Sequence, residues 1–213
     1  MQKNLTVELI SDVSCPWCII GYLSFQKALQ TLPKDVDVEI RWRAFELNPA
    51  MGKSGQNLIQ HIVEKYGLSA EESADNRKML VEKGKEFSFD FNFEPQTRIY
   101  NTFDAHRLLH WSKLWNKQTA LKMALFRAYF SEGRDPSDHN VLVDVAKDVE
   151  LDGDSARAVL ASDQFKQEVR QEQEFYRQMG VEAVPTFIFN KKYVITGGQP
   201  VDAFVRALND ILQ

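Results

Sequence analysis

The sequence predicts an α/β fold in which a small core of strands and helices is interrupted by a large, all-helical insertion. Strand and helix patterns alternate at the start of the chain and again at its end, whereas helical patterns dominate from residue 55 to residue 179. With 213 residues, 44% of them hydrophobic, the chain can bury a full core. We therefore expect a globular domain that carries an insertion.

The first part of the core is predicted as strand, helix and strand. Residues 4–13 form a short apolar run typical of a buried strand, and residues 16–31 place apolar side chains three and four positions apart, as a helix does. Residues 36–45 alternate apolar and charged side chains, which is the pattern of a half-buried strand. Because a helix connects them, the two strands should lie parallel in one sheet.

The insertion is predicted to consist of consecutive helices. Ser69 and Glu72 fit a capping box, which places a helix start at Ser69. Gly180 fits the end of the last of these helices. Phenylalanines alternate with other residues from 87 to 93, and we interpret this segment as an extended connector. Further helix starts are predicted at Asn101, Ser137 and Ser162.

The last part of the core is predicted as a hairpin followed by a helix. Strand patterns at residues 186–189 and 192–196 flank a short Asn190-Lys191 turn, and Pro200 begins an amphipathic helix. Without the insertion, this order of elements is that of a thioredoxin fold. The predicted division is a discontinuous thioredoxin-like domain over residues 1–54 and 180–213, with the helical insertion domain over residues 55–179.

Composition excludes several classes of partner. The net charge of -4, without a run of Lys and Arg, argues against binding to nucleic acid or to an anionic membrane surface. No segment approaches the roughly 20 apolar residues that span a bilayer, and the N-terminal stretch lacks the apolar core of a signal peptide. We therefore expect a cytoplasmic protein, in which a disulfide is more often catalytic or redox-sensing than structural.

The stretch Ser14-Cys15-Pro16-Trp17-Cys18 contains the only two cysteines of the chain, at the start of the first predicted helix. Free backbone N–H groups and the helix dipole favour a thiolate at this position, and Pro fits the first helical position because it has no N–H. Cys18 follows one turn later, within reach for a disulfide and directed towards the core. We therefore assign Cys15 as an exposed nucleophile with a lowered pKa, and Cys18 as the resolving cysteine.

Two other interpretations of the cysteine pair are weaker. A structural disulfide across so short a loop would remove little entropy from the unfolded chain. A zinc site would need two more ligands, which His106 and His110 offer at helical spacing, but nothing in the sequence brings that helix to Cys15. We therefore expect no bound metal.

A proline at the start of a predicted strand is the second candidate catalytic feature, in the stretch GVEAVPTF. Most X-Pro bonds are trans. In the thioredoxin fold, however, the corresponding proline is cis and faces the active disulfide, and the backbone of the preceding residue pairs with an extended substrate. These roles would fall to Pro185 and Val184.

Five motifs extend this pattern from residue 11 to residue 200: SDVSCPWCIIG, RWRAFELNP, NTFDAHRLLHW, GVEAVPTFIFN and ITGGQP. With these motifs, the whole chain resembles the DsbA family of the FrnE type. The resemblance implies a thioredoxin fold with a helical insertion and thiol-disulfide oxidoreductase activity. The related 2-hydroxychromene-2-carboxylate isomerases and kappa-class glutathione transferases share the architecture but commonly carry serine at the first cysteine position. Because this sequence keeps both cysteines, redox chemistry is favoured over isomerisation.

Four further residues are candidates for substrate binding. Pro16 and Trp17 stand between the two cysteines, where an aromatic side chain would shape substrate access. Asn101 and His106 belong to a motif of the resemblance, and the helical insertion of such proteins usually covers the active site. They are therefore candidates for its lining, although helix capping by Asn101 and core packing by His106 are the simpler interpretations.

A carboxylate near the cysteines could relay a proton from the resolving thiol. Glu8 and Asp12 lie near Cys15 in the sequence. Thioredoxins carry the relay group six residues before the first cysteine, where this chain has Leu9. Neither carboxylate can be assigned to the role from the sequence, and Glu8 could equally be a solvated charge at a strand end.

The sequence alone leaves three functions open. The favoured one is a thiol-disulfide oxidoreductase that exchanges a Cys15-Cys18 disulfide with proteins or small thiols and needs no tightly bound cofactor. The second is a glutathione-dependent isomerase or transferase, in which glutathione is a co-substrate that Cys15 positions or activates. The third is a binding or chaperone-like module whose cysteines sense oxidation. The direction of electron flow, the physiological substrate and the oligomeric state do not follow from the sequence.

Overall fold

The structure, a computed structural model, describes residues 3–94 and 97–213. Its central sheet has the strand order β2-β1-β5-β6. β1 and β2 are parallel, from the pair Lys3 and Val36 to the pair Ser11 and Ala44, and β5 is antiparallel to β1 and β6. The predicted strands and the parallel pairing of the first two are thus confirmed. The strands are β1 (Lys3–Ser11), β2 (Val36–Ala44), β5 (Thr186–Phe189) and β6 (Tyr193–Thr196).

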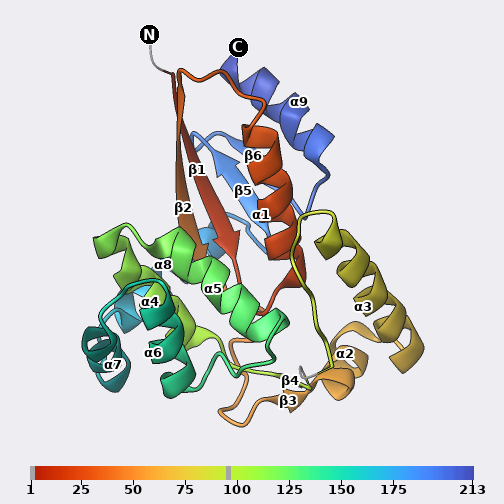
Figure 1. The fold of residues 1–213 in the computed structure, drawn as a ribbon, viewed down its shortest axis with the longest axis vertical. Helices are drawn as coiled ribbons and strands as arrows, with labels where there is room; N and C mark the ends of the chain where they lie inside the picture. The colour runs from red at the N-terminus through yellow and green to blue at the C-terminus, as the bar shows by residue number, and fades with distance from the viewer. Residues whose placement is uncertain (1–2, 95–96) are drawn as a thin grey trace.

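Helices cover both faces of the sheet. α1 (Pro16–Leu29) and α9 (Val201–Leu212) lie side by side on one face (Figure 1). There the Phe25 ring centroid lies 5.5 Å from that of Phe187 and 5.4 Å from that of Phe204. α8 (Lys166–Gln178) covers the other face, where Tyr176 packs in a small cluster with Ile10 and Ile188. Successive side chains of β1 therefore point alternately towards the face covered by α1 and towards the face covered by α8.

The insertion follows β2, and most of its helices other than α8 lie beyond the end of the sheet at which β1 and β2 finish (Figure 1). Its described residues form mainly helices, with the short strands β3 (Gln56–Asn57) and β4 (Arg98–Ile99) among them. The antiparallel pairing of these strands joins the two ends of the segment that holds α2 and α3. The prediction that the insertion is entirely helical is therefore wrong, because it contains these two short strands. The helices before α8 are α2 (Leu58–Tyr66), α3 (Ala70–Lys85), α4 (Phe103–Ser112), α5 (Gln118–Phe130), α6 (His139–Asp148) and α7 (Gly153–Ala161), with a 3-10 turn at Lys113–Trp115.

The predicted helix starts are confirmed to different degrees. Ser69 caps α3 through both bonds of the capping box. α4 begins two residues after Asn101, and the side chain that caps α6 is that of Asp138, the residue after Ser137. The start at Ser162 is wrong, because the Ser162 backbone is extended and ends α7, while its carbonyl accepts a bond from Arg107. α8 ends just before Gly180, whose φ of +84° suits a helix end, as predicted.

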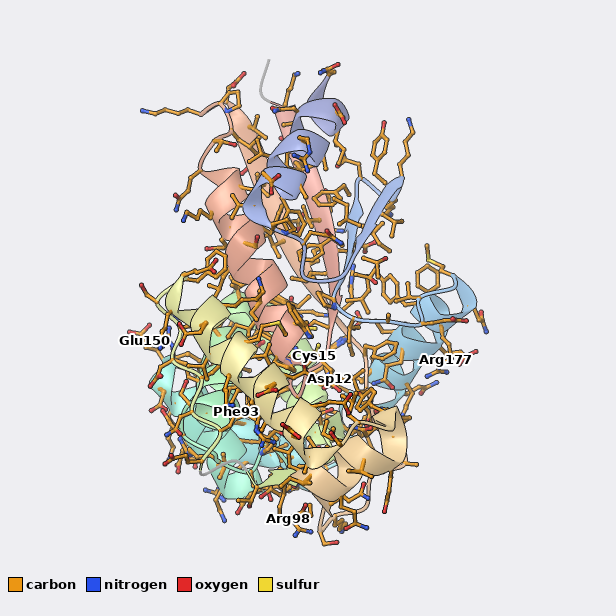
Figure 2. All side chains as sticks on the ribbon, turned by 90° about the vertical axis from the view of Figure 1, so that its right-hand side faces the viewer. Asp12, Cys15, Phe93, Arg98, Glu150 and Arg177 are labelled. Atoms are coloured by element: carbon orange, nitrogen blue, oxygen red, sulfur yellow. The ribbon has the colours of Figure 1, made fainter. Side chains whose placement is uncertain are left out.

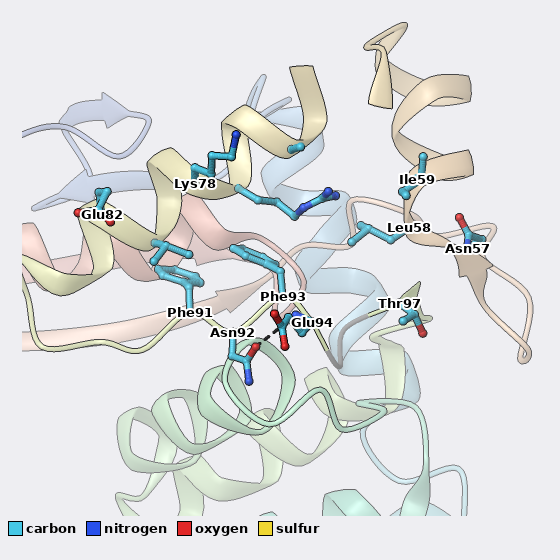
Figure 3. A pocket seen from close by; sticks show the side chains of 13 residues that line it. Asn57, Leu58, Ile59, Lys78, Glu82, Phe91, Asn92, Phe93, Glu94 and Thr97 are labelled. Atoms are coloured by element: carbon cyan, nitrogen blue, oxygen red, sulfur yellow. Dashed lines mark hydrogen bonds between the residues drawn. The ribbon is translucent and has the colours of Figure 1, made fainter. Parts of the chain in front are cut away.

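The phenylalanine-rich segment is a connector that packs against the core. Residues 89–93 form neither helix nor strand. The Phe91 ring centroid lies 4.8 Å from that of Phe89 and 5.5 Å from that of Phe130. Figure 3 shows Phe91 and Phe93 facing α3, beside an open cavity of about 660 Å3. The alternation therefore reflects burial of aromatic rings along a connector.

Two hydrophobic clusters hold the cysteine turn between them. The larger contains Leu9 and Cys18, and it continues into the insertion through Phe126 of α5. The second lies among α4 to α7 and includes Val13, which is part of the loop between β1 and α1. The residues just before Cys15 are therefore anchored in the insertion. The boundaries 1–54, 180–213 and 55–179 stay a prediction.

Membrane-spanning segments were expected to be absent. Within residues 3–94 and 97–213, no helix has both the length and the apolar character needed to cross a bilayer.

Candidate active site

The CPWC turn has the predicted position at the start of α1. Cys15 is the N-cap, with extended backbone angles (φ -99°, ψ 109°), and Pro16 occupies the first turn. The Cys18 N–H donates to the Cys15 carbonyl at 3.1 Å, and both cysteines are free thiols. Figure 2 shows Cys15 and Asp12 where the sheet meets the insertion. The turn therefore presents a dithiol at a helix N-terminus, where the helix dipole favours negative charge.

Pro185 lies next to this turn. The Val184-Pro185 bond is cis, and the Cys15 thiol donates to the Val184 carbonyl at 3.6 Å. Both parts of the sequence prediction, the cis bond and its position beside Cys15, are confirmed. The loop before β5 therefore forms one wall of the site.

Close backbone contacts fix the turn against the Gly197-Gly198 loop. A Cβ atom on Gly21 would lie 3.1 Å from the Pro185 Cγ atom, and one on Gly198 would lie 3.0 Å from a ring carbon of Trp17 and 3.1 Å from the Trp17 carbonyl oxygen. These distances are shorter than ordinary contacts, so glycine at both positions lets α1 approach the loops around Pro185.

Gly198→Ala should therefore displace the first turn of α1. Because the obstructing atoms include backbone, we expect a loss of about 1 to 3 kcal/mol in the free energy of unfolding, together with a changed alkylation rate of Cys15. Denaturant unfolding and alkylation kinetics measure both. Gly52→Ala is the matched control, since a Cβ there meets nothing within 4 Å. Equal behaviour of the two variants would contradict the close packing.

A cavity of about 730 Å3 opens beside the turn and is lined by Cys15 but not by Cys18. Cys15 is nevertheless only 4% exposed, and Cys18 is 0% exposed. The expected exposure of Cys15 is therefore wrong, because side chains of α2, α3 and the Val184 loop surround the cavity. A substrate could reach the Cys15 sulfur through this cavity.

The structure brings three of the predicted binding residues to the cavity and leaves two outside its lining. Pro16, Trp17 and Val184 line it. The Asn101 amide instead donates to the Met51 carbonyl at 3.1 Å, and its oxygen accepts from the Phe103 N–H at 2.9 Å at the start of α4. His106 is buried below the turn. For Asn101 and His106 the geometry favours positioning of the chain over contact with a substrate.

The insertion contributes cavity residues that the sequence did not reveal. They come mainly from α2 and α3 and include His61, Lys65, Tyr66 and Arg77. Glu46 also lines the cavity, and its Oε1 atom is buried without a hydrogen-bond partner among residues 3–94 and 97–213. The amphipathic pattern of α2 was the available signal, but it does not indicate what the helix faces.

Glu8 lies away from the cysteines. Its carboxylate pairs with Arg43 at 2.6 Å, and Arg43 also pairs with Glu172 of α8 at 3.0 Å. These contacts are on the face of the sheet opposite α1, so a proton relay from Glu8 to Cys18 is excluded by geometry.

Asp12 is the carboxylate that lies below the turn. One of its oxygens accepts from the Leu47 N–H at 2.7 Å and from the Ser14 hydroxyl at 3.0 Å, and the other lies 3.3 Å from the His106 Nε2. Burial would raise the pKa of Asp12, but the hydrogen bond and charge of His106, the Leu47 N–H and the charge of Lys122 lower it to about 2. Asp12 is therefore a fixed negative charge.

The two thiols affect each other's pKa. The hydrogen bond with Cys18, followed by burial, raises the pKa of Cys15 well above its ordinary value. Burial opposes ionisation of Cys18 too, but the hydrogen bond from Cys15, the charge of Lys122 and bonds from Ser11 and Asp12 lower the pKa of Cys18. The prediction of a lowered pKa at Cys15 is therefore wrong for the reduced pair, because the hydrogen bond with Cys18 and burial both oppose ionisation of Cys15.

A metal site was not expected near the cysteines. Across the part of the chain that the structure describes, no group of three or more His, Cys, Asp or Glu side chains is arranged to hold a metal ion.

Comparison with known proteins identifies the family. Residues 6–209 match the family model of the DSBA-like thioredoxin domain. The chain belongs to this DsbA-like family. A probable DsbA oxidoreductase from Streptomyces coelicolor is 33% identical to this DsbA-like chain, with a TM-score of 0.90 over 98% of this chain and 90% of that one.

Two further relatives are more distant. The uncharacterized protein YwbO of Bacillus subtilis (strain 168) is 28% identical over 96% of both chains. The cytosolic disulfide reductase DsbM of Pseudomonas aeruginosa, solved with GSH, is 14% identical, with a TM-score of 0.65 over 97% of this chain and 98% of that one. At this identity, DsbM shows only that the DsbA-like fold is shared.

Proposed function

We propose that this DsbA-like protein is a thiol-disulfide oxidoreductase that exchanges a Cys15-Cys18 disulfide with thiol or disulfide substrates. The observation that carries the proposal is the placement of the two thiols at a helix start. There the Cys15 thiol donates a hydrogen bond to the carbonyl of Val184, the residue before cis-Pro185. Membership in the DsbA-like family supports it. The narrower assignments, to the FrnE type and to the cytoplasm, are part of this proposal.

The two cysteines have different roles in the proposed reaction. Cys15 lines the cavity and is the nucleophile, whereas Cys18 is buried behind it and resolves the mixed disulfide. The raised pKa of Cys15 is compatible with attack when Cys18 is ionised, because the Cys18 sulfur can then take the Cys15 proton as the new sulfur bond forms. Val184, the residue before Pro185, also lines the cavity, where an extended substrate would lie.

The substrates of this reaction are proteins or small thiols. The cavity beside the cysteine turn has a volume of about 730 Å3, which is large enough for a small molecule or a short peptide segment. Glutathione is therefore a candidate co-substrate, and the structure of DsbM with GSH is consistent with this idea. A glutathione-dependent isomerase or transferase is the alternative, but its chemistry would leave Cys18 without a role.

Reduction of insulin by dithiothreitol tests the proposal. Wild-type protein should accelerate insulin precipitation, and Cys15→Ser should abolish the acceleration because it removes the sulfur that faces the cavity. Gly52→Ala is the control, because a Cβ there meets nothing within 4 Å, and it should keep most of the activity. If wild type and Cys15→Ser were equally inactive, while glutathione-dependent turnover survived in Cys18→Ser, the isomerase or transferase alternative would replace the proposal.

A further inference from the structure

A second cavity adjoins the one that contains Cys15 and has no role in the function proposed above. This side groove, of about 660 Å3, lies between α3, the start of α2 and the connector that holds the phenylalanines. Figure 3 shows Phe91 and Phe93 directed towards α3, with Ile59 on α2. The apolar part of its lining consists of Leu58, Ile59, Ala74, Val81, Phe91 and Phe93. Apolar surface that gathers in one open hollow is typical of an interaction site.

The side groove and the cysteine cavity have side chains in common. Leu58, Arg77 and Phe93 line both of them, whereas Ile59 lines only the side groove and Cys15 lines only the cysteine cavity. The shared side chains come from α2, α3 and the connector, so the two hollows adjoin where these three segments meet. A ligand longer than the cysteine cavity would therefore extend over this junction into the side groove.

Arg77 stands at the junction with most of its hydrogen-bonding capacity unused by the protein. Its Nη1 donates to the Ser73 hydroxyl, one turn earlier on α3, at 3.1 Å. Among residues 3–94 and 97–213, the Arg77 side chain has no other hydrogen bond and no ion pair. A guanidinium has five N–H donors. The carbonyl oxygens of a main chain that crosses the junction would accept hydrogen bonds from the donors that remain.

Size and charge favour a polypeptide segment as the occupant of the side groove. The cysteine cavity, at about 730 Å3, is already large enough for a small thiol, so such a thiol does not need the side groove. The charged residues that line the groove are balanced, because Arg77 and Lys78 are basic whereas Glu82 and Glu94 are acidic. Its surface therefore suits an apolar side chain carried on an extended chain better than it suits an ion.

We infer that the side groove binds an apolar side chain of a polypeptide substrate, a short way along the chain from the cysteine that reacts with Cys15, while Arg77 donates to the main chain between them. This inference rests on the proposed function and assigns a substrate class to it, namely polypeptides that carry an apolar residue near a cysteine. The selecting residues belong to the insertion, whereas the reacting thiols belong to the thioredoxin-like core.

Thiol exchange at equilibrium on Cys15 tests the inference. In Cys18→Ser protein, a peptide thiol attacks the disulfide between Cys15 and N-acetylcysteine amide. The amide leaves as a thiol and takes up the peptide's proton, so one disulfide replaces another without net oxidation. Each peptide has one cysteine among glycines and serines, with one leucine or one further serine at graded distances on either side. At one distance or more, we expect the leucine peptide to be preferred over its serine counterpart about three- to tenfold.

Ile59→Ser in the same Cys18→Ser protein should remove this preference. Ile59 lines the side groove but not the cysteine cavity, and it is 43% exposed, so the substitution removes little buried surface. Val63→Ser is the matched control, because Val63 lies one turn later on α2, is 46% exposed and lines neither hollow. No leucine preference at any distance, a preference that survives Ile59→Ser, or an equal loss in Val63→Ser would overturn the inference.

Arg77→Met tests the contact with the main chain. It should lower the preference for peptides over N-acetylcysteine amide about two- to tenfold, for leucine and serine peptides alike, because it removes donors that do not depend on the side chain. An unchanged preference would overturn the role of Arg77. If Cys15 formed no mixed disulfide with any of these thiols, the result would contradict the proposed function itself, which distinguishes that failure from a failure of the side groove.

Discussion

Cys18→Ser should accumulate disulfide-linked adducts with substrate proteins. The substitution leaves the Cys15 sulfur facing the cavity but removes the sulfur that resolves the mixed disulfide. Non-reducing gels of protein isolated under alkylating conditions should show adduct bands that disappear on reduction. Cys15→Ser should show none, because the buried Cys18 does not line the cavity.

The same pair of variants distinguishes the proposed function from its alternative. If Cys15 only positions glutathione, Cys18 has no step to perform, and Cys18→Ser should leave glutathione-dependent turnover unchanged without forming protein adducts. Adducts of equal amount in both variants would mean that Cys18 reaches substrates directly, which contradicts its burial behind Cys15.

Asp12→Ala should lower the free energy of unfolding by about 3 to 5 kcal/mol at neutral pH, as expected when one member of a buried charged network is removed. The substitution leaves the Leu47 N–H and the Ser14 hydroxyl without their acceptor, and it removes a negative charge that interacts with Lys122. Asp12→Asn, which keeps an oxygen, should cost less. Asp75→Ala, which removes an exposed carboxylate that pairs with Lys78, should change the value by no more than about 0.5 kcal/mol.

The stabilisation by Asp12 should also depend on pH. Its pKa of about 2 in the folded protein is below the ordinary value of about 3.9. The ionised form therefore contributes about 2 to 3 kcal/mol above pH 4, and this contribution is lost as the pH falls through 2. Chemical denaturation between pH 2 and 6 should show that decline in the wild type and a flatter profile in Asp12→Asn. Parallel profiles would contradict the lowered pKa.

The cysteine turn could be predicted from the sequence because its geometry depends on residues that are close together in the chain. Pro at the first helical position and the spacing of Cys15 and Cys18 fix the turn, and the strand patterns around it fix the parallel pair β1 and β2. Pro185 required more than local sequence. Its cis bond and its place beside Cys15 were predicted from the order of elements, which the structure reproduces.

The rest of the site depends on contacts between distant segments. Lys122 stands more than a hundred residues after Cys18, on a helix for which no separate start was predicted, and only the packing of α5 against Trp42 brings it behind the turn. The contact between Asp12, which follows β1, and His106, which belongs to α4 of the insertion, likewise depends on the packing of distant segments. The pKa of Cys15 is raised mainly by its hydrogen bond with Cys18 and by burial, so a prediction from the helix N-terminus alone gave the wrong direction for this shift.

Equilibration of the wild-type protein in glutathione buffers of graded redox potential tests the central claim most directly. After acid quenching and alkylation, mass spectrometry should show one transition in which Cys15 and Cys18 change together from two alkylated thiols to one disulfide. Its midpoint should fall between about -270 and -120 mV, the range of CxxC oxidoreductases. A stable glutathione adduct on Cys15 with Cys18 still alkylated, and no Cys15-Cys18 disulfide at any potential, would contradict the account.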